Sequence, residues 1–398
     1  MAELDDIEVT FVGHPFAPIG MGEQLRSHIS ACAALRLGFG VYDIFRYAQR
    51  SDAAHFSVVG ERERENVGRG IRIFHVNGDE VDSVIAAFET RGNEFAAGHN
   101  IVVPAWELPS YPRAWAEKLA RFDEVWAISG FVQQGLLAAG VASRRIGQSV
   151  ETDPIAFLPR RHFGVRESSF VLLHFLDLTS YASRKNPQAV LELARRLWAE
   201  QPFLDLQLVL KVKNGEQPAE EWAEAFRGDP RVQVLDAPLD SIGVRSLINC
   251  CDCFVSLHRA EGFGRGLGEA MALGKLALGT GWSGNLDFMT AENALLARHD
   301  MVRLKRDEYP HWQGQSWAEP DVAHAAELLR PLLADPARGR ALAAKGQREV
   351  LRSHGHRAVG LRILARLEEI AAGSAKLSGP ASGAPPRRGR AAVTAAVA

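Results

Sequence analysis

Short apolar runs that alternate with helical patterns constrain the fold of this chain more than any other feature. The runs are nearly continuous in Val, Ile, Leu and Phe, and segments of helical periodicity separate them. Strands of this kind are buried on both faces, and helical crossovers join them into parallel sheets. The expected strands are 7–13, 40–45, 71–76, 100–105 and 124–129, followed by 170–176, 206–212, 232–235, 253–257, 276–280 and 294–297.

The two series of strands predict two domains. The expected helices between the strands are 22–37, 81–90, 112–122, 130–139, 187–200, 218–227, 240–250 and 266–273. We therefore predict an α/β fold of two Rossmann-like domains whose parallel sheets face a cleft, with C-terminal helices over about 320–371. The predicted division is 1–158 for the first domain, 159–350 for the second, 351–372 for a helix returning to the first domain, and 373–398 for a disordered tail.

Composition narrows the class of protein. A length of 398 residues suits two domains, and a formal net charge of −2 argues against a nucleic-acid partner. The acidic N-terminal segment has no apolar signal core, and no run of 18 apolar residues predicts a membrane span. Three of the four cysteines, Cys250, Cys251 and Cys253, are expected to be buried reduced thiols. We expect a cytoplasmic protein.

The segment "EGFGRGLGE" holds two glutamates, Glu261 and Glu269, with glycine at every second position between them. It follows an expected strand, so Glu261 lies at a carboxyl edge, and a helix from about Gly266 would place Glu269 in its first turn. Glycines let a phosphate approach the free N–H groups of that turn, and carboxylates accept hydrogen bonds from sugar hydroxyls. A phosphosugar, another anionic ligand or a purely structural turn all fit this pattern.

Four segments in order make the likeness to a known family specific. They are "EGFGRGLGEAMALGKLALGTGWSGNLDF" (261–288), "SRKNPQAV" (183–190), "WELPSYPRAW" with "FDEVWAIS" (106–115 and 122–129), and "GMGEQLR" (20–26). Together they resemble retaining glycosyltransferases of the GT-B fold, family 4 (group 1), of the bacterial surface-polysaccharide type. The resemblance implies a hexosyltransferase that moves a sugar from a nucleoside-diphosphate-sugar to a hydroxyl of a glycan or lipid-linked acceptor, with retention.

The resemblance also implies roles for the paired glutamates. Glu261 would contact the transferred sugar and Glu269 the nucleotide ribose. The backbone around Phe263, Gly264 and Leu267 would face the sugar and the diphosphate. The alternatives are a surface loop acid for Glu261 and, for Glu269, a solvated carboxylate that complements the helix dipole.

The departing diphosphate needs positive charge, because negative charge develops on it as the sugar leaves. Arg184 and Lys185 stand between an expected strand and a helix starting near Pro187, so they are the first candidates. Many relatives carry an arginine several residues earlier, where this chain has "DLTSYA", so Lys211 or Lys213 is the alternative second cation. No D-x-D triad is present, and we expect chemistry without a metal or other cofactor.

Further donor-side residues are expected beside the paired glutamates. His258 borders the segment and is expected to hydrogen-bond to groups around the site. Ser283, Gly284 and Asn285, in "WSGN", form a small-residue loop that lies near the donor sugar or is a plain turn.

The acceptor side is expected to come from the first domain. Gly20, Gly22 and Glu23 open the first helix, although helix capping alone also explains Glu23. Glu107 follows a strand directly and is a candidate acid or base, or else a capping carboxylate. His75 ends another strand and is either a site residue or a satisfied core histidine.

The helix expected at 112–122 carries an apolar stripe of Tyr111, Trp115, Leu119 and Phe122 beside basic residues. Packing on the first sheet explains this stripe, and peripheral contact with the inner membrane is the alternative. Two other functions stay open on the sequence: a non-transferring nucleotide-sugar enzyme such as an epimerase, and a non-catalytic nucleotide-sugar-binding protein.

Overall fold

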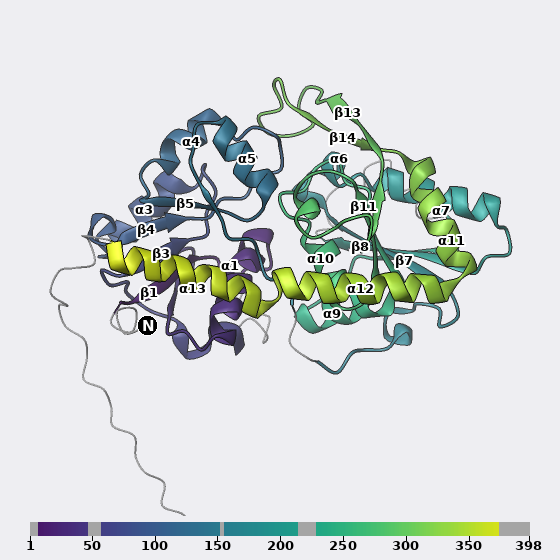
Figure 1. The fold of residues 1–398 in the computed structure, drawn as a ribbon, viewed down its shortest axis with the longest axis horizontal. Coiled ribbons are helices and arrows are strands. Elements are labelled where there is room, and N and C mark those ends of the chain that lie inside the picture. Colours follow the sequence, from purple (N-terminus) through teal and green to yellow (C-terminus); the bar gives the residue numbers. More distant parts are fainter. Residues whose placement is uncertain (1–6, 47–56, 152–154, 214–227, 374–398) are drawn as a thin grey trace, which may run out of the picture.

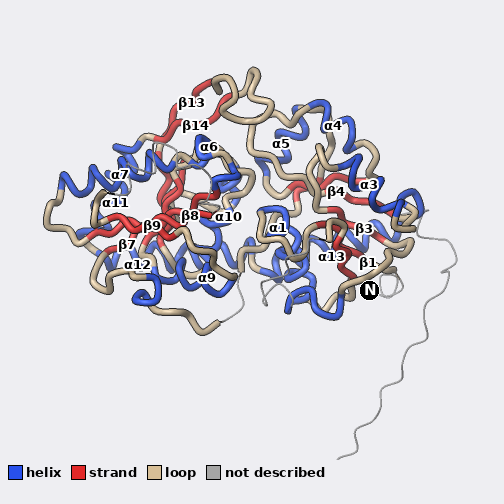
Figure 2. Tube along the Cα trace, turned by 180° about the vertical axis from the view of Figure 1, so that it is seen from behind, coloured by secondary structure: helices blue, strands red, loops and turns tan. Residues whose placement is uncertain are grey.

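The computed structural model describes residues 7–46, 57–151, 155–213 and 228–373. The helix expected at 218–227 lies outside these residues, as does the expected tail from 374 onward. The chain forms two six-stranded sheets, each covered by helices, so the predicted α/β fold with two Rossmann-like sheets is confirmed (Figure 1). Seen from behind, the strands gather into two groups, one per domain (Figure 2).

The first sheet has the strand order β2-β1-β3-β4-β5-β6, and all its pairs are parallel. Its strands are β1 Val9–Gly13, β2 Gly40–Asp43, β3 Ile71–Phe74, β4 His99–Val102, β5 Glu124–Ala127 and β6 Arg144–Arg145. Its helices are α1 Gly20–Ala34, α3 Val81–Thr90, α4 Arg113–Leu119 and α5 Gly130–Ala138. Burial on both faces accounts for the continuous apolar sequence of strands such as β1 and β3, whereas β6 is exposed and was not predicted.

The second sheet has the order β12-β11-β10-β7-β8-β9, again with parallel pairs throughout. Its strands are β7 Phe170–Asp177, β8 Leu206–Lys213, β9 Val232–Leu235, β10 Cys253–Ser256, β11 Leu276–Thr280 and β12 Leu295–Ala297. Its helices are α6 Ala182–Lys185, α7 Pro187–Glu200, α9 Ser241–Cys250, α10 Arg265–Ala272, α11 Val322–Ala334 and α12 Pro336–His354. The strand order reverses between β7 and β10, and ligands of open parallel sheets bind beyond the carboxyl ends at such a point.

An antiparallel hairpin, β13 His299–Arg303 and β14 Ser316–Pro320, was missed by the sequence analysis. β13 is exposed or half-buried along its length, so it has none of the continuous apolar character of strands such as β1 and β3. Its connecting loop, residues 304–315, reaches from the second domain towards the first (Figure 1).

The chain crosses between the domains twice, and the two crossings lie side by side. The first follows β6 near Val150, and the second joins α12 to α13, His356–Gly373. The Val150 N–H donates to His354 O at 3.0 Å, and the His356 N–H donates to the Glu151 carboxylate at 2.7 Å. α13 then packs along α1 of the first domain. Gly360 allows this close approach, since a Cβ there would lie 2.4 Å from Ala31 O.

The apolar stripe at α4 packs inward. Tyr111, Leu119 and Phe122 are at most 8% exposed, and Trp115 packs against the same core. Packing on the first sheet therefore accounts for this stripe. Among the described residues, no helix combines the length and apolarity that crossing a bilayer requires.

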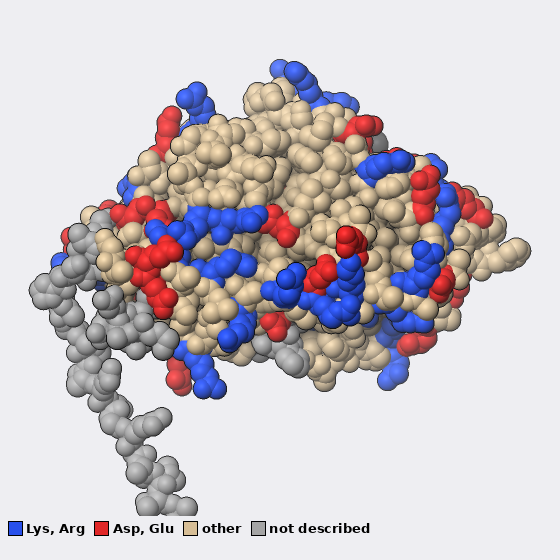
Figure 3. Space-filling view, viewed as in Figure 1, with Lys and Arg blue, Asp and Glu red and all other residues tan. Residues whose placement is uncertain are grey.

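Charge on the face that carries α12 and α13 is mixed. Figure 3 shows Lys and Arg gathered over these helices with Asp and Glu among them. Ion pairs such as Arg366–Glu124 and Lys345–Glu292 (2.8 Å) join the two signs. The cysteines of the described chain are free and buried, as expected.

Candidate active site

A buried ion cluster lies at the point where the second sheet reverses its strand order. α6 follows β7, and the loop of residues 257–264 follows β10, which is the neighbouring strand. This geometry brings Lys185 Nζ to 2.5 Å from Glu261 Oε1, and Arg184 Nη1 to 3.3 Å from Glu261 Oε2. Lys185 and Glu261 are 76 positions apart in the chain, yet with Arg184 they form one cluster.

Charge dominates the ionisation of this cluster. Glu261 is only 9% exposed, and burial alone would raise the pKa of its carboxyl. The positive charges of Lys185 and Arg184 outweigh burial and hold that pKa at about 2. The Glu261 carboxylate is therefore ionised throughout the neutral range.

Arg184 is fixed more tightly than Lys185. Its guanidinium donates to Ala260 O at 2.9 Å and to Ser180 Oγ at 2.6 Å, and its side chain is 3% exposed. Burial alone would lower the Arg184 pKa, but Glu261 and then Glu107 outweigh it and raise the pKa above its usual range. The Lys185 side chain is 22% exposed, so it is the cation of the pair with access to a ligand.

The "WSGN" loop supports the backbone that carries Glu261. Ser283 Oγ accepts the Glu261 N–H at 3.0 Å, and the Gly284 N–H donates to Glu261 O at 2.9 Å. A Cβ on Gly284 would lie 2.2 Å from Gly262 O, so this position needs glycine. The loop therefore stands behind the Glu261 backbone, with Ser283 5% exposed, and the place of this loop near a donor sugar stays a prediction.

His258 and Asn285 complete that support. Both are fully buried, and His258 Nε2 lies 3.2 Å from Asn285 Oδ1, while Asn285 Nδ2 donates to Thr280 O at 3.0 Å. Burial lowers the pKa of His258, although Glu261 opposes the shift. His258 thus hydrogen-bonds to groups around the site without facing the cleft.

The helix that carries the second glutamate begins one residue earlier than predicted. α10 begins at Arg265, with Gly264 in the left-handed region (φ 87°) as its N-cap, so Glu269 is past the first turn. The earlier start follows from Gly264, whose missing Cβ permits that conformation. The side chains of Phe263 and Leu267 are 3% and 1% exposed and pack in the core, which leaves their backbone as the part available to a ligand.

Glu269 lies on a cleft between the two domains. Arg265 Nε is 2.8 Å from Glu269 Oε1, and Arg265 Nη2 is 3.8 Å from Glu23 Oε2 of α1. Burial raises the pKa of the Glu269 carboxyl, with Arg265 opposing and Glu23 adding to the shift. Arg265 therefore links carboxylates of both domains.

A cavity of 300 Å³ opens beside Glu269. Its lining includes the cations Arg26, Lys213, Arg245 and Arg265, and the apolar side chains Phe175, Leu239 and Val244. Such a combination suits a ligand with a flat apolar part and a negative part. Arg245, Arg265 and Phe175 were not singled out from the sequence, because their positions carry no motif and acquire meaning only when the cleft forms.

Lys211 is buried in the second sheet, whereas Lys213 borders the cleft. Lys211 is 8% exposed, donates to Val212 O at 2.6 Å, and burial lowers its pKa. Lys213 lines the cavity, lies 3.6 Å from Asp177 and reaches Pro18 O of the first domain. Of the two lysines proposed as a second cation, only Lys213 borders the cavity.

Of the residues predicted on the first domain, some border the cavity and others are buried in the core. Gly20 and Glu23 lie at the start of α1, where Glu23 pairs with Arg26 at 2.6 Å and borders the cavity. Gly22 is needed for packing, because a Cβ there would lie 2.3 Å from Ala17 O. His75 is fully buried, and Gln24 Nε2 lies 3.3 Å from its Nδ1, so the alternative of a core histidine is the one that the structure favours.

Glu107 approaches the ion cluster through the loop of residues 304–315, which we call the clasp. Tyr309 Oη donates to Glu107 Oε2 at 2.6 Å, and the Tyr309 ring packs on Trp106 at 5.8 Å and under the Arg184 guanidinium at 5.9 Å. Gln315 adds two hydrogen bonds to the Ser110 backbone. Tyr309 was not predicted as a site residue, because nothing in the sequence shows that this loop meets the other domain.

Comparison with known proteins identifies the second domain. Residues 170–304 match the family model described as glycosyl transferases group 1. These residues form a group 1 glycosyltransferase domain. The predicted resemblance is thereby confirmed, and Glu261, Lys185 and Glu269 all lie inside this glycosyltransferase domain. A comparison with curated protein sequences found no match.

Solved structures share the two-domain arrangement of this chain. HepE of Anabaena, in complex with UDP and glucose, has a TM-score of 0.63 at 16% identity, covering 91% of this chain and 100% of that chain. Sucrose-phosphate synthase of Thermosynechococcus elongatus has a TM-score of 0.64 at 14% identity, with 92% and 100% covered. Trehalose 6-phosphate synthase of Burkholderia multivorans has a TM-score of 0.56 at 12% identity, with 92% and 99% covered. These likenesses establish the GT-B fold.

Proposed function

We propose that this glycosyltransferase moves a hexose from a nucleoside-diphosphate-sugar to a hydroxyl of a glycan or lipid-linked acceptor, with retention at the anomeric carbon. The observation that carries the proposal is the cluster of Glu261 with Lys185 and Arg184 at the reversal point of the glycosyltransferase domain. A buried carboxylate held between two cations offers acceptors for sugar hydroxyls beside positive charge for a leaving phosphate.

The nucleotide would occupy the cleft cavity beside Glu269. The ribose hydroxyls would bind the Glu269 carboxylate, and the base would lie against Phe175 and Leu239. HepE, which shares the fold, binds UDP and glucose and, in a second structure, UDP-glucose. A uridine diphosphate hexose is therefore the first donor to test.

Charge on the departing diphosphate would be stabilised by Lys185, by Arg184 through the cluster, and by the free N–H groups of α10. The Gly264 N-cap leaves that helix end open, because a left-handed glycine supplies no side chain to cap it. We propose that these groups neutralise the phosphate without a metal ion or other cofactor. Among the described residues, no three His, Cys, Asp or Glu side chains form a metal site.

The acceptor would approach from the first domain, where Glu107 faces the cluster from across the cleft. Its contact with Tyr309 shows that it lies near Arg184 when the domains are together. In this proposal Glu107 orients the acceptor hydroxyl, and the leaving phosphate takes the proton of that hydroxyl. Assembly of cell-surface polysaccharide on the cytoplasmic side of the membrane is the setting that we propose.

A donor panel tests this function. Purified protein is incubated with uridine, guanosine and adenosine diphosphate hexoses, with and without cell-envelope glycan, and release of nucleotide is measured. Glu261→Ala and Lys185→Ala are expected to abolish release while circular dichroism stays native. Lys345→Ala, which removes an exposed ion-paired lysine, is the matched control and should keep full activity. Near-normal release by either site variant would contradict the proposed site.

A further inference from the structure

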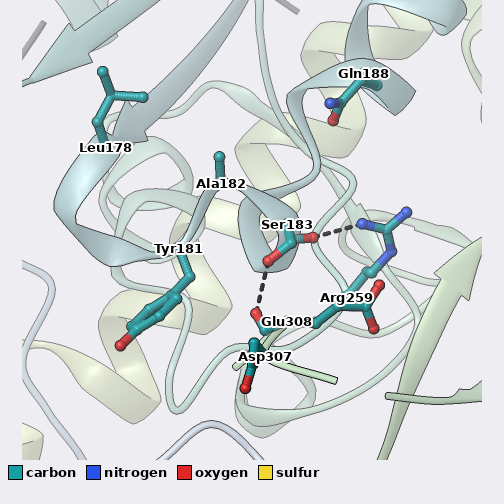
Figure 4. Close-up of a pocket in the computed structure, with 8 residues that line it drawn as sticks. All are labelled: Leu178, Tyr181, Ala182, Ser183, Gln188, Arg259, Asp307 and Glu308. Atoms are coloured by element: carbon teal, nitrogen blue, oxygen red, sulfur yellow. Dashed lines mark hydrogen bonds between the residues drawn. The ribbon is translucent and has the colours of Figure 1, made fainter. Parts of the chain in front are cut away.

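A second cavity, of 520 Å³, lies at the carboxyl edge of the second sheet and away from the nucleotide cleft. Its lining includes Tyr181, Ser183, Gln188, Arg259, Asp307 and Glu308 (Figure 4). None of these residues has a part in the proposed donor site. The cavity is therefore a candidate for a second binding site.

Hydrogen bonds hold the walls of this cavity in place. Ser183 Oγ donates to Glu308 O at 2.9 Å, and Arg259 Nη1 donates to Ser183 O at 2.6 Å (Figure 4). Tyr181 and Asp307 both have left-handed backbones, with φ of 59° and 63°. Non-glycine residues in this region are strained and persist only where surrounding contacts fix them, often at ligand sites. These contacts therefore fix the shape of the cavity.

The charge of the lining disfavours an anion. Arg259 already pairs with Glu319, at 2.6 Å and 3.1 Å, so its positive charge is compensated. Asp307 and Glu308 add two carboxylates to the lining. A phosphate or acidic sugar would be repelled, and a lipid chain would find too few apolar partners. A neutral ligand rich in hydroxyl groups matches the carboxylates, the Gln188 amide and the Ser183 hydroxyl.

Tyr181 supplies the apolar part of such a site. Its side chain is 43% exposed, although its ring packs edge-on against Tyr309 with centroids 4.8 Å apart. A tyrosine ring offers apolar area and a polar tip with few torsions to immobilise. The C–H face of a sugar ring can pack on it while the hydroxyls of the sugar meet the polar lining.

The cavity shares a wall with the proposed reaction centre. Ser183 directly precedes Arg184, and the Arg259 N–H donates to Arg184 O at 2.8 Å. On the other side of this short helix, Lys185 holds Glu261, and Tyr309 joins the Tyr181 ring to Glu107. A sugar bound in the cavity would therefore lie one helical turn from the cluster that is proposed to hold the donor sugar.

We propose that this cavity binds a neutral sugar residue of the acceptor glycan, with Tyr181 as the stacking platform. The inference rests on the proposed function and extends it, because it assigns part of acceptor binding to the glycosyltransferase domain rather than to the first domain. It also gives the clasp a second role, since Asp307 and Glu308 belong to the loop that carries Tyr309.

The test measures retention of the full chain on an array of neutral, acidic and amine-bearing oligosaccharides. We expect retention on neutral oligosaccharides that falls at least tenfold in Tyr181→Ala and at most about threefold in Tyr181→Phe. Phe203→Ala is the matched control, because Phe203 is a fully exposed aromatic residue of the same domain outside the cavity. Its retention should equal that of the wild type.

Three outcomes would overturn the inference: no retention of any neutral oligosaccharide, equal retention by Tyr181→Ala, or retention confined to acidic or amine-bearing oligosaccharides. Binding of UDP is measured in parallel by calorimetry and should be the same in Tyr181→Ala as in the wild type. Failure on the array with UDP binding intact would remove only the acceptor subsite. Failure of both measurements would remove the proposed function as well.

Discussion

The contact behind the Glu261 loop makes a sharp prediction for Gly284→Ala. The added Cβ would lie 2.2 Å from Gly262 O and 2.6 Å from the Phe263 nitrogen, which are backbone atoms that no rotamer change can move. An ordinary contact begins near 3.4 Å, so the two loops must separate by about 1 Å. The separation strains the hydrogen bond from the Gly284 N–H to Glu261 O.

Two magnitudes follow from that displacement. Overpacking of a tight site costs about 1–3 kcal/mol, which would lower the melting temperature of a domain of this size by about 3–10 °C. A shift of about 1 Å in a reacting group costs about 100-fold in rate. Activity should therefore suffer far more than stability.

The assay combines thermal unfolding by circular dichroism with nucleotide release from the best donor of the panel. Gly38→Ala is the control, because a Cβ added to Gly38 would meet no atom within 4 Å and the backbone there has ordinary angles. The reasoning fails if Gly284→Ala melts within 1 °C of the wild type and keeps its rate within twofold. The melting measurement alone tests the steric argument, even for a donor that is turned over slowly.

Three further predictions concern single groups of the site. Tyr309→Phe keeps the aromatic packing but removes the hydrogen bond to Glu107, so limited proteolysis within the clasp should become several-fold faster while thermal unfolding changes little; unchanged cleavage would count against a clasp. Burial raises the pKa of Glu269 in the folded state, so its ionised carboxylate destabilises the fold once the pH exceeds 4.5. Glu269→Gln should therefore raise the melting temperature at pH 8 but not at pH 4, and it should weaken UDP binding. A lower melting temperature of Glu269→Gln at pH 8 would contradict this prediction. The pKa of Glu261 is about 2 in the folded state against 4.5 in the unfolded chain, so its ionisation contributes about 3 kcal/mol to the free energy of unfolding above pH 4.5, and this contribution is lost as the pH falls towards 2. In urea unfolding, the wild type should be more stable than Glu261→Gln at pH 7, with a smaller difference at pH 3.5. A difference in stability that does not change with pH would contradict this prediction.

Sequence reasoning predicted the elements that the hydrophobic pattern controls. Central strands such as β10 are buried along their whole length, and continuous apolar runs such as "CFVSL" predict them. The meeting of Lys185 with Glu261 was also predictable, because both follow strands whose carboxyl ends share one edge. The helix that carries Glu269 begins one residue earlier than predicted, at Arg265, because the left-handed Gly264 precedes it.

What the sequence could not show depends on contacts between distant segments. The hairpin of β13 and β14 is exposed along one strand, so its pattern resembles a loop. The contacts of Ser283 with the Glu261 backbone and of Asn285 with His258 likewise depend on the fold and could not be predicted from the sequence. The clasp is visible only once two domains stand together, because Tyr309 and Glu107 are 202 positions apart.

The paired crossings between the domains limit how this protein can open. A single connection would let the two domains rotate freely relative to each other. Two adjacent connections, joined by the hydrogen bond from the Val150 N–H to His354 O, restrict the domains to rotation about one hinge. The movement available to the domains is a hinge rotation about these residues. Opening would separate the clasp, which lies away from this hinge, from the first domain, and would move Glu107 away from Arg184.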